Sequence, residues 1–266
     1  MPSLRVDRDT PDVALLTMSR PASLNALDSR LMAELYDTLA GLGQDPGVRV
    51  VILTGEGRGF CAGLDVRDFG GPVPAVSDGP DALLAFQQYM SQIVAVVRDL
   101  PQPVIAAVNG AAVGGGMALA CAADIRLAAP GARFGVGAVR LGLSGCEMGL
   151  SYHLPRLVGM SAAAEWMLTG RLVGADEARA AGLVSRVVAA PQLLAAAGEL
   201  AAAIIGNAPF GIRMTKRVMW ANLGEADLAR ALDRENKAQV LAVTTRDAGE
   251  ARAAFLERRP PRFTDR

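Results

Sequence analysis

Two glycine-rich segments of this 266-residue chain have the composition to do chemistry through their backbone. Residues 114–116 (Gly-Gly-Gly) follow the apolar run 103–108 and precede the small-residue segment 117–121, which indicates a strand, a turn and a helix. Backbone N–H groups at the start of such a helix bind oxyanions. A second segment, residues 55–65, follows the apolar run 50–53. Two such turns can direct two N–H donors at one carbonyl oxygen, although glycines that merely permit tight turns would explain either segment alone.

The order and spacing of motifs along almost the whole chain resemble those of the enoyl-CoA hydratase/isomerase (crotonase) family. The matching segments are residues 20–27, 60–65, 103–110, 114–116, 123–126, 168–170, 175–184 and 255–259. The resemblance implies an α/β fold, a crotonase-like spiral of repeated ββα units with a C-terminal all-helical oligomerisation region. It implies an acyl-CoA-binding core over residues 1–200 and a trimerisation region over 201–266, assembled as a homotrimer or as a hexamer (a dimer of trimers).

The resemblance also assigns an oxyanion hole. Enzymes of this family hold the thioester oxygen of an acyl-CoA with two backbone N–H groups, which stabilise the enolate. The matching positions here are Ala62 and Gly115. Neighbouring positions are expected to contact CoA or substrate: Ala26, Gly63, Leu64, Asp65 and Gly114. We expect no metal and no cofactor, since coenzyme A is part of the substrate.

The acids of the family's hydratases are missing. Those enzymes place two glutamates around one water, and the matching positions here are Ala118 and Ala138, which carry no proton. One acid remains, Glu147. Counted back from Pro155 it matches the acid of the family's isomerases; counted forward from Leu141 it is one residue late, which implies a one-residue insertion. Glu147 is therefore the expected catalytic acid/base, with a solvated or helix-capping glutamate as the alternative.

Three functions follow as alternatives. The first is an isomerase or lyase of lipid metabolism that moves the double bond of an enoyl-CoA with Glu147 as its single acid/base. The second is an enoyl-CoA hydratase with a non-standard acid or a bound water, and the third is a non-catalytic acyl-CoA-binding protein. A Clp-type serine protease is disfavoured because His153, the sole histidine, completes no convincing Ser-His-Asp set.

The amino-acid composition limits the classes of partner that the protein is expected to bind. Lys+Arg and Asp+Glu number 27 each, so no basic excess favours nucleic acid. The chain shows no apolar run long enough for a membrane span and no signal-peptide pattern at its start, so we expect a cytoplasmic protein. Cys61, Cys121 and Cys146 are interpreted as small buried thiols, and His153 as a packed polar residue; one histidine excludes a histidine-based metal cluster.

Five further charged positions also have an interpretation. Asp65 and Asp124 match family positions and are expected to stabilise turns and helix starts. Arg258 and Arg259 either meet CoA phosphates, from the same or a neighbouring subunit, or belong to a solvated C-terminal charge run. Glu165 is interpreted as a charge on a helix face.

Strands that alternate with helices position these residues. The predicted strands cover 13–18, 50–54, 103–108 and 125–127, and the predicted helices cover 28–42, with Asp28 as N-cap and Gly43 as stop, and 82–100. Residues 70–80 are predicted to form a loop, and the chain from about 201 onward is predicted to be all-helical. This alternation favours mainly parallel strands.

Overall fold

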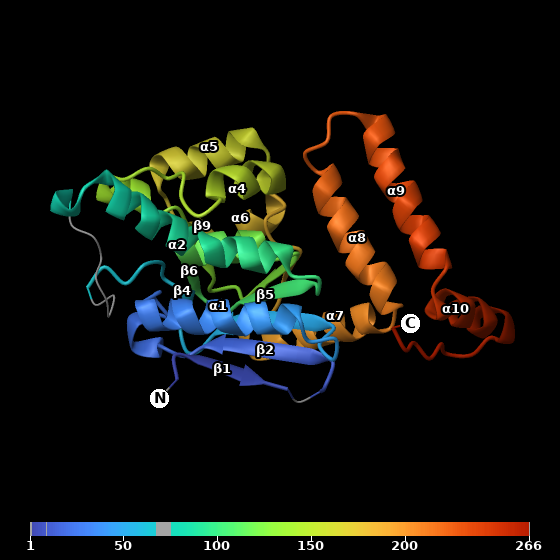
Figure 1. Ribbon diagram of the computed structural model, residues 1–266. Helices are drawn as coiled ribbons and strands as arrows, with labels where there is room; N and C mark the ends of the chain where they lie inside the picture. The colour runs from blue at the N-terminus through green and yellow to red at the C-terminus, as the bar shows by residue number, and fades with distance from the viewer. Residues whose placement is uncertain (1, 9, 68–75, 266) are drawn as a thin grey trace.

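Two sheets form the centre of the computed structural model, which describes residues 2–8, 10–67 and 76–265 (Figure 1). In the described residues the first sheet has the order β1 (Leu4–Asp7), β2 (Val13–Met18), β3 (Val50–Gly55), β5 (Val104–Val108), β7 (Ile125–Ala128) and β10 (Arg186–Val187). The second has the order β4 (Gly59–Cys61), β6 (Ala111–Val113), β8 (Arg133–Gly135) and β9 (Val173–Gly174). All neighbours run parallel except the pairs β1–β2 and β8–β9.

The chain repeats one unit as it crosses these sheets. It passes from β3 to β4 and then α2 (Pro80–Asp99), from β5 to β6 and then α3 (Gly115–Ala122), and from β7 to β8 and then, after a 3-10 turn, α4 (Leu150–Val158). Each unit adds the next strand to both sheets, so β3, β5 and β7 are neighbours, as are β4, β6 and β8. This is the expected spiral of ββα units, and it brings the turns after β4 and β6 side by side.

The first two long helices form largely where the sequence pattern predicts them. α1 (Ser29–Gly43) begins after Asp28, whose Oδ1 accepts a hydrogen bond of 2.7 Å from the Leu31 N–H, and its leucines face the core. α2 begins at Pro80, two residues before the predicted start. In the predicted loop 70–80, residues 70–75 lie outside the described residues, and Val76–Asp78 forms a 3-10 turn instead.

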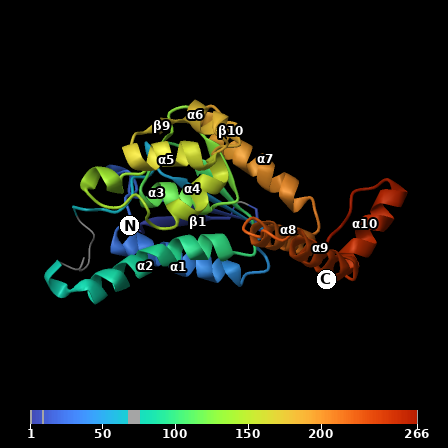
Figure 2. The ribbon, with the colours of Figure 1, turned by 90° about the horizontal axis from the view of Figure 1, so that it is seen from above.

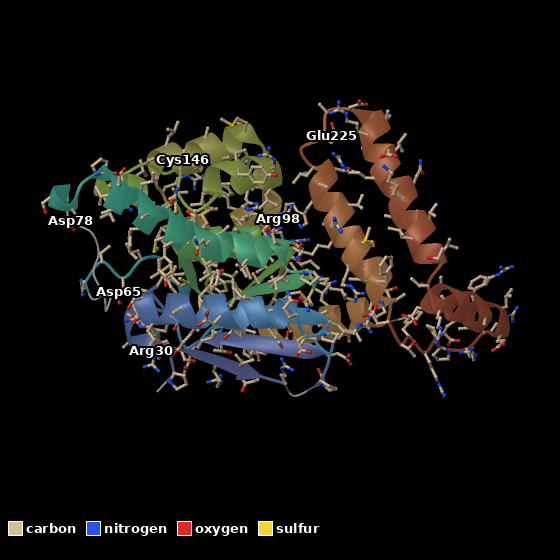
Figure 3. The ribbon with its side chains drawn as sticks, in the orientation of Figure 1. Arg30, Asp65, Asp78, Arg98, Cys146 and Glu225 are labelled. Atoms are coloured by element: carbon tan, nitrogen blue, oxygen red, sulfur yellow. The ribbon has the colours of Figure 1, made fainter. Side chains whose placement is uncertain are left out.

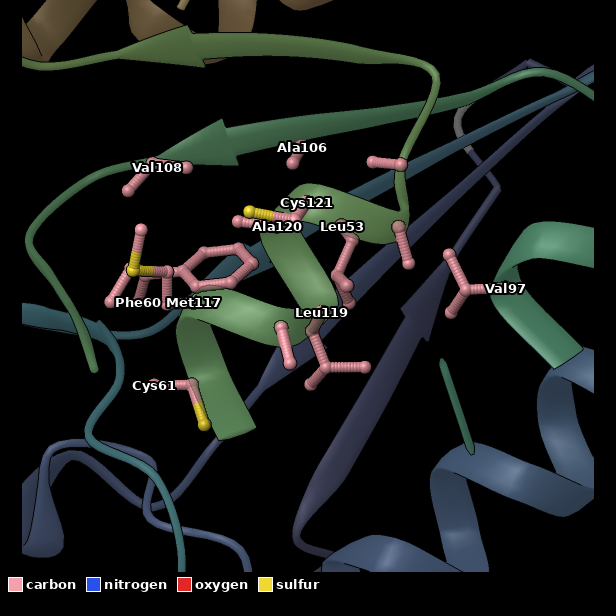
Figure 4. Close-up of a cluster of buried hydrophobic side chains, with 14 of the residues drawn as sticks. Leu53, Phe60, Cys61, Val97, Ala106, Val108, Met117, Leu119, Ala120 and Cys121 are labelled. Carbon is pink, nitrogen blue, oxygen red and sulfur yellow. The ribbon is translucent and has the colours of Figure 1, made fainter. Parts of the chain in front are cut away.

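Helix α3 lies at the centre of the molecule. Every residue of it is buried, and it packs among β4, β6, α2 and α4. Figure 4 shows side chains of α3 in the buried cluster with Phe60 of β4. Small side chains permit this close packing: a Cβ on Gly116 would lie 1.9 Å from the Cys61 carbonyl oxygen. The position of the helix N-terminus is therefore fixed by the core around it.

The chain continues through α5 (Met160–Thr169) and α6 (Ala175–Ala180) to α7 (Leu193–Ile205). Leu193, Ala197 and Ala201 of α7 pack on the face of the first sheet opposite the main core. The expected domain boundary between residues 200 and 201 falls inside α7, and the next helices follow Ile205.

Three helices form that appendage: α8 (Pro209–Asn222), α9 (Leu228–Val243) and α10 (Arg246–Glu257). They extend from the side of the ββα spiral (Figures 1 and 2). Among the described residues no single helix is long and apolar enough to cross a membrane; residues Ala190–Ile205 and α8 pass that test only together, across a bend of 106°.

Asp124 connects α8 to the ββα spiral through an ion pair and hydrogen bonds. Its carboxylate is buried, lies 2.8 Å from Lys216 Nζ, and accepts hydrogen bonds from Trp220 Nε1 at 2.6 Å and from the Val104 N–H at 2.7 Å. Lys216 Nζ also donates to the Gln102 carbonyl at 2.9 Å. Asp124 is structural, as expected, but it joins two parts of the fold rather than stabilising a turn or a helix start.

Candidate active site

The first donor of the site is at the start of α3. The Gly114 N–H donates to the Gly135 carbonyl at 2.9 Å, whereas the Gly115 N–H has no acceptor within the described part of the chain. As the first residue of the helix, Gly115 has no carbonyl partner inside it. The positive end of the helix dipole adds to the attraction of this N–H for an anionic oxygen.

The second donor is not the expected one. The Ala62 N–H donates to the Leu24 carbonyl at 3.0 Å, so it is already occupied. The two residues on either side of Leu64 pair with Leu27. The Leu27 N–H donates to the Gly63 carbonyl at 2.7 Å, and the Leu27 carbonyl accepts from the Asp65 N–H at 2.9 Å. Between them, the Leu64 N–H has no acceptor in the described residues. Leu64 therefore replaces Ala62 as the available donor.

Gly63 brings the two turns together. It has a φ of +93°, and a Cβ built on it would lie 2.9 Å from the Val113 carbonyl oxygen and 3.6 Å from the Gly115 nitrogen. A side chain at this position would thus be strained and would crowd the neighbouring turn. The absence of one lets the chain around Leu64 lie against the start of α3.

Glu147 lies over this pair of turns. A Cβ built on Gly114 would be 3.3 Å from Glu147 Oε1, which is buried and has no hydrogen-bond partner among the described residues. Burial raises the pKa of this carboxyl above its usual range. The chain turns sharply after it, because Met148 and Gly149 have φ values of +44° and +79°. The structure therefore directs the Glu147 carboxyl group toward the glycine turns rather than into solvent.

The two alanines at the hydratase-type positions are both buried. Ala118 is in the second turn of α3 and is fully enclosed, and Ala138 begins the 3-10 turn Ala138–Leu141. Neither can transfer a proton. The nearby Asp65 carboxylate is bound 2.9 Å from Arg20 Nη2 and accepts from the Arg67 N–H at 3.2 Å. Its contacts are those of a structural residue.

Arg20 organises the segment before Leu64. Its guanidinium donates to the Ala26 carbonyl, and it pairs with Asp28 at 3.1 Å as well as with Asp65. Ala26 is buried beneath these contacts. Asp65 lies close to the start of α1 (Figure 3). This network fixes the backbone of the second turn, and a surface hollow that includes Arg20, Asp65 and Arg67 opens beside it.

His153 is a packed core residue, as expected. It is 4% exposed and lies edge-on to the rings of Tyr152 and Trp220. Burial lowers its pKa to about 4, with Arg98 and other arginines adding to the effect. The imidazole is therefore neutral at physiological pH.

Acidification from pH 6.5 to pH 4 is expected to reduce the free energy of unfolding by roughly 1–3 kcal/mol through His153 alone. The pKa in the folded chain, about 4, lies below the ordinary 6.5, so the unfolded chain takes up the proton first as pH falls. This contribution is complete above pH 6.5 and is lost as pH falls toward 4. Urea unfolding of wild type and His153→Gln at pH 7 and pH 5 checks it, and an equal pH response in both would contradict it.

One of the three cysteines differs from its expected state. Cys61 and Cys121 are buried thiols, with pKa values raised to about 12 by burial, but Cys146 is exposed, because it lies in the loop before α4 (Figure 3). Arg259 is held by Glu250 and Glu257, each at 2.6 Å, while Arg258 adopts a left-handed conformation at the end of α10. Exposed Glu165 pairs with Arg171 at 2.7 Å, as suits a helix-face charge.

The ββα spiral with its helical appendage is a crotonase-type fold. A family model described as "Enoyl-CoA hydratase/isomerase" matches residues 9–266, and the chain belongs to this family. It is 43% identical to the "Probable enoyl-CoA hydratase EchA12" of Mycobacterium tuberculosis over 98% of this chain and 92% of that protein.

Two solved structures extend the comparison. A crystal structure titled as a probable enoyl-CoA hydratase/isomerase from Mycobacterium abscessus matches with a TM-score of 0.91 and 39% identity over the whole of both chains. A monofunctional enoyl-CoA isomerase from M. smegmatis matches with a TM-score of 0.75 and 41% identity, over 87% of this chain and 99% of that one. The similar proteins thus carry hydratase and isomerase names alike.

Proposed function

We propose that this protein moves the double bond of an enoyl-CoA, with Glu147 as its single acid/base and with the N–H groups of Leu64 and Gly115 as its oxyanion hole. The observation that carries the proposal is the Glu147 carboxyl group, whose buried Oε1 lies beside the glycine turns without a partner in the described residues. Alanines at positions 118 and 138 leave no second acid of the hydratase type.

One carboxylate is sufficient for the proposed reaction. The Glu147 carboxylate takes a proton from C2 of a 3-enoyl-CoA, and the electron pair of that C–H bond delocalises into the thioester carbonyl on one side of C2 and over the C3–C4 double bond on the other. The resulting dienolate oxygen accepts hydrogen bonds from Leu64 and Gly115, and such a donor is typically worth about 3–4 kcal/mol in the transition state. The glutamic acid then returns the proton to C4, and the double bond lies between C2 and C3. The raised pKa makes Glu147 a stronger base than an ordinary glutamate.

A surface hollow gives the coenzyme A portion of the proposed substrate a route to this site. The hollow beside Arg20 and Asp65 leads to the turn that contains Leu64, and Arg67 is exposed at its rim. Within this proposal Ala26, Gly63 and Asp65 act by holding the turn, and Leu64 contributes its N–H. Arg67 supplies positive charge near the phosphates. This arrangement supports an acyl-CoA thioester as the substrate.

Hydration of a 2-enoyl-CoA is the second candidate, and the hydratase names of most of the similar curated proteins favour it. It needs a group to activate water and a group to deliver a proton, so a residue other than Ala118 or Ala138 would have to supply one of them. Rates of isomerisation and hydration in wild type and Glu147→Gln separate the two candidates. Binding of acyl-CoA with neither activity would favour the non-catalytic alternative.

We further propose a homotrimer, alone or paired as a hexamer. No residue of α9 is buried, and Leu228, Val240 and Val243 are 62–71% exposed. On α10, Phe255 is 83% exposed. So many large apolar side chains on adjacent helices are typical of a subunit interface.

The trimer is expected in sedimentation velocity at micromolar concentration. Phe255→Glu should shift the protein toward monomer, because it places a charge in the apolar interface. Lys237→Gln on α9, which alters a polar exposed position, is the control and should sediment like wild type. A stable wild-type monomer would rule out the proposed assembly.

A further inference from the structure

Met148 lies directly beside the oxyanion donor. A Cβ built on Gly115 would be 3.0 Å from the Met148 sulfur and 3.5 Å from its terminal methyl carbon. The side chain is 5% exposed, so it is enclosed by the protein on most sides. It follows Glu147 in the chain, and the side chains of both residues reach the three-glycine turn. A group bound between Glu147 and Gly115 would therefore have the Met148 thioether as a close neighbour.

Met148 also lines a cavity of about 410 Å³. It is formed between α2 and α4, and Val94, Arg98, Tyr152 and His153 line it together with Met148. Ala95 and Tyr152 at its rim are exposed, so the cavity opens to solvent. Arg98 marks its position near the end of α2 that faces α8 (Figure 3). Met148 thus lies beside the Gly115 turn and is also one of the residues that line the outer cavity.

The backbone holds Met148 in an unusual conformation. Its φ of +44° lies in the left-handed region, which is strained for a residue with a Cβ. The following Gly149 also has a positive φ, of +79°. This turn places the thioether against Gly115 and leaves the Glu147 carboxyl over Gly114. A methionine side chain is flexible and fills irregular space well, so it suits a barrier that must fit against a substrate.

We propose that Met148 determines acyl-chain specificity by separating the reaction site from the cavity between α2 and α4. With Met148 in place, the site favours short acyl groups. Removal of the side chain joins the two spaces, and a long straight chain can then pass between α2 and α4 to solvent. The inference rests on the proposed acyl-CoA function and names the part of the substrate that the site selects.

The experiment compares a short and a long substrate in Met148 variants. Met148→Ala is expected to raise the ratio of kcat/KM for a dodecenoyl-CoA to that for a hexenoyl-CoA by about tenfold or more. Met148→Gly should act in the same direction, and it also relieves the positive-φ strain, so it serves if the alanine variant folds poorly. Met148→Leu, which conserves volume, should keep the ratio within about threefold of wild type.

Binding of unreactive substrates separates this inference from the proposed reaction. Calorimetry with hexanoyl-CoA and dodecanoyl-CoA should show the same change of preference in Met148→Ala without any turnover. Met32→Ala, a truncation of another buried methionine, on α1, should lower stability and leave the preference unchanged. Acyl-CoA binding with an unchanged preference in both Met148 truncations would overturn the specificity role alone. Failure of wild type to bind either ligand would overturn the proposed function, and the specificity role with it.

Discussion

Replacement of Glu147 by glutamine is expected to lower kcat for isomerisation of a 3-enoyl-CoA by about 10²–10⁴-fold. Glutamine has the shape of glutamate, so the packing over Gly114 should be kept, but it neither takes nor returns a proton. The dissociation constant of a saturated acyl-CoA should change little, since Leu64 and Gly115 still hold the thioester oxygen. Stopped-flow or steady-state absorbance with 3-enoyl-CoA measures the first quantity, and calorimetry the second.

The same assay distinguishes the alternatives. Wild type is expected to hydrate a 2-enoyl-CoA weakly or not at all, because hydration needs two proton-transfer functions and positions 118 and 138 supply none. Fast hydration by wild type would contradict the argument from the two alanines. Isomerisation at a normal rate in Glu147→Gln would remove this residue from the mechanism. If acyl-CoA binds and neither reaction occurs, the protein is a binding protein.

Local sequence signals predicted much of the core. The N-cap at Asp28 and the leucines that follow it predict α1 because a cap and a helical apolar period act within a few turns. The apolar runs before each glycine-rich turn likewise predict β3 and β5. In these segments the local preference and the final environment agree.

The choice between Ala62 and Leu64 could not be made in the same way. Ala62 and Leu64 lie on either side of Gly63, and their N–H groups differ in whether a carbonyl oxygen lies beside them. The Ala62 N–H is occupied by the carbonyl of Leu24, which is remote in the chain, and Leu64 is left available. No sequence pattern near residue 62 indicates that residue 24 lies beside it in the fold.

The extent of α7 beyond the expected domain boundary could not be predicted, for a related reason. α7 is rich in alanine and apolar around much of its circumference, so its pattern does not reveal which surface it covers. The packing of Leu193, Ala197 and Ala201 against the sheet depends on residues that are distant in the chain. The direction of the Glu147 side chain was likewise not predictable from the local pattern, since it depends on the positive φ angles at residues 148 and 149.

Proline at position 115 is expected to lower kcat by about 10²–10³-fold relative to alanine at the same position, the usual cost of one lost oxyanion donor. Gly115 is the first residue of α3, where proline is well tolerated because no helical hydrogen bond is lost. Proline removes the N–H, whereas alanine retains it. Both add a Cβ that meets the ends of the Leu27 and Met148 side chains at 2.9 and 3.0 Å, so alanine is the matched control for crowding.

The comparison of the two variants isolates the hydrogen bond from the packing. Thermal unfolding midpoints should be close to each other, because the added contacts are similar, and both should lie below that of wild type. Steady-state kinetics with a 3-enoyl-CoA should then show most of the loss in kcat, since the N–H binds the dienolate oxygen more strongly than the neutral thioester. Equal kcat values in the two variants would show that Gly115 gives no hydrogen bond in the transition state. The oxyanion would then have to be held by Leu64 and by groups other than the first N–H of α3.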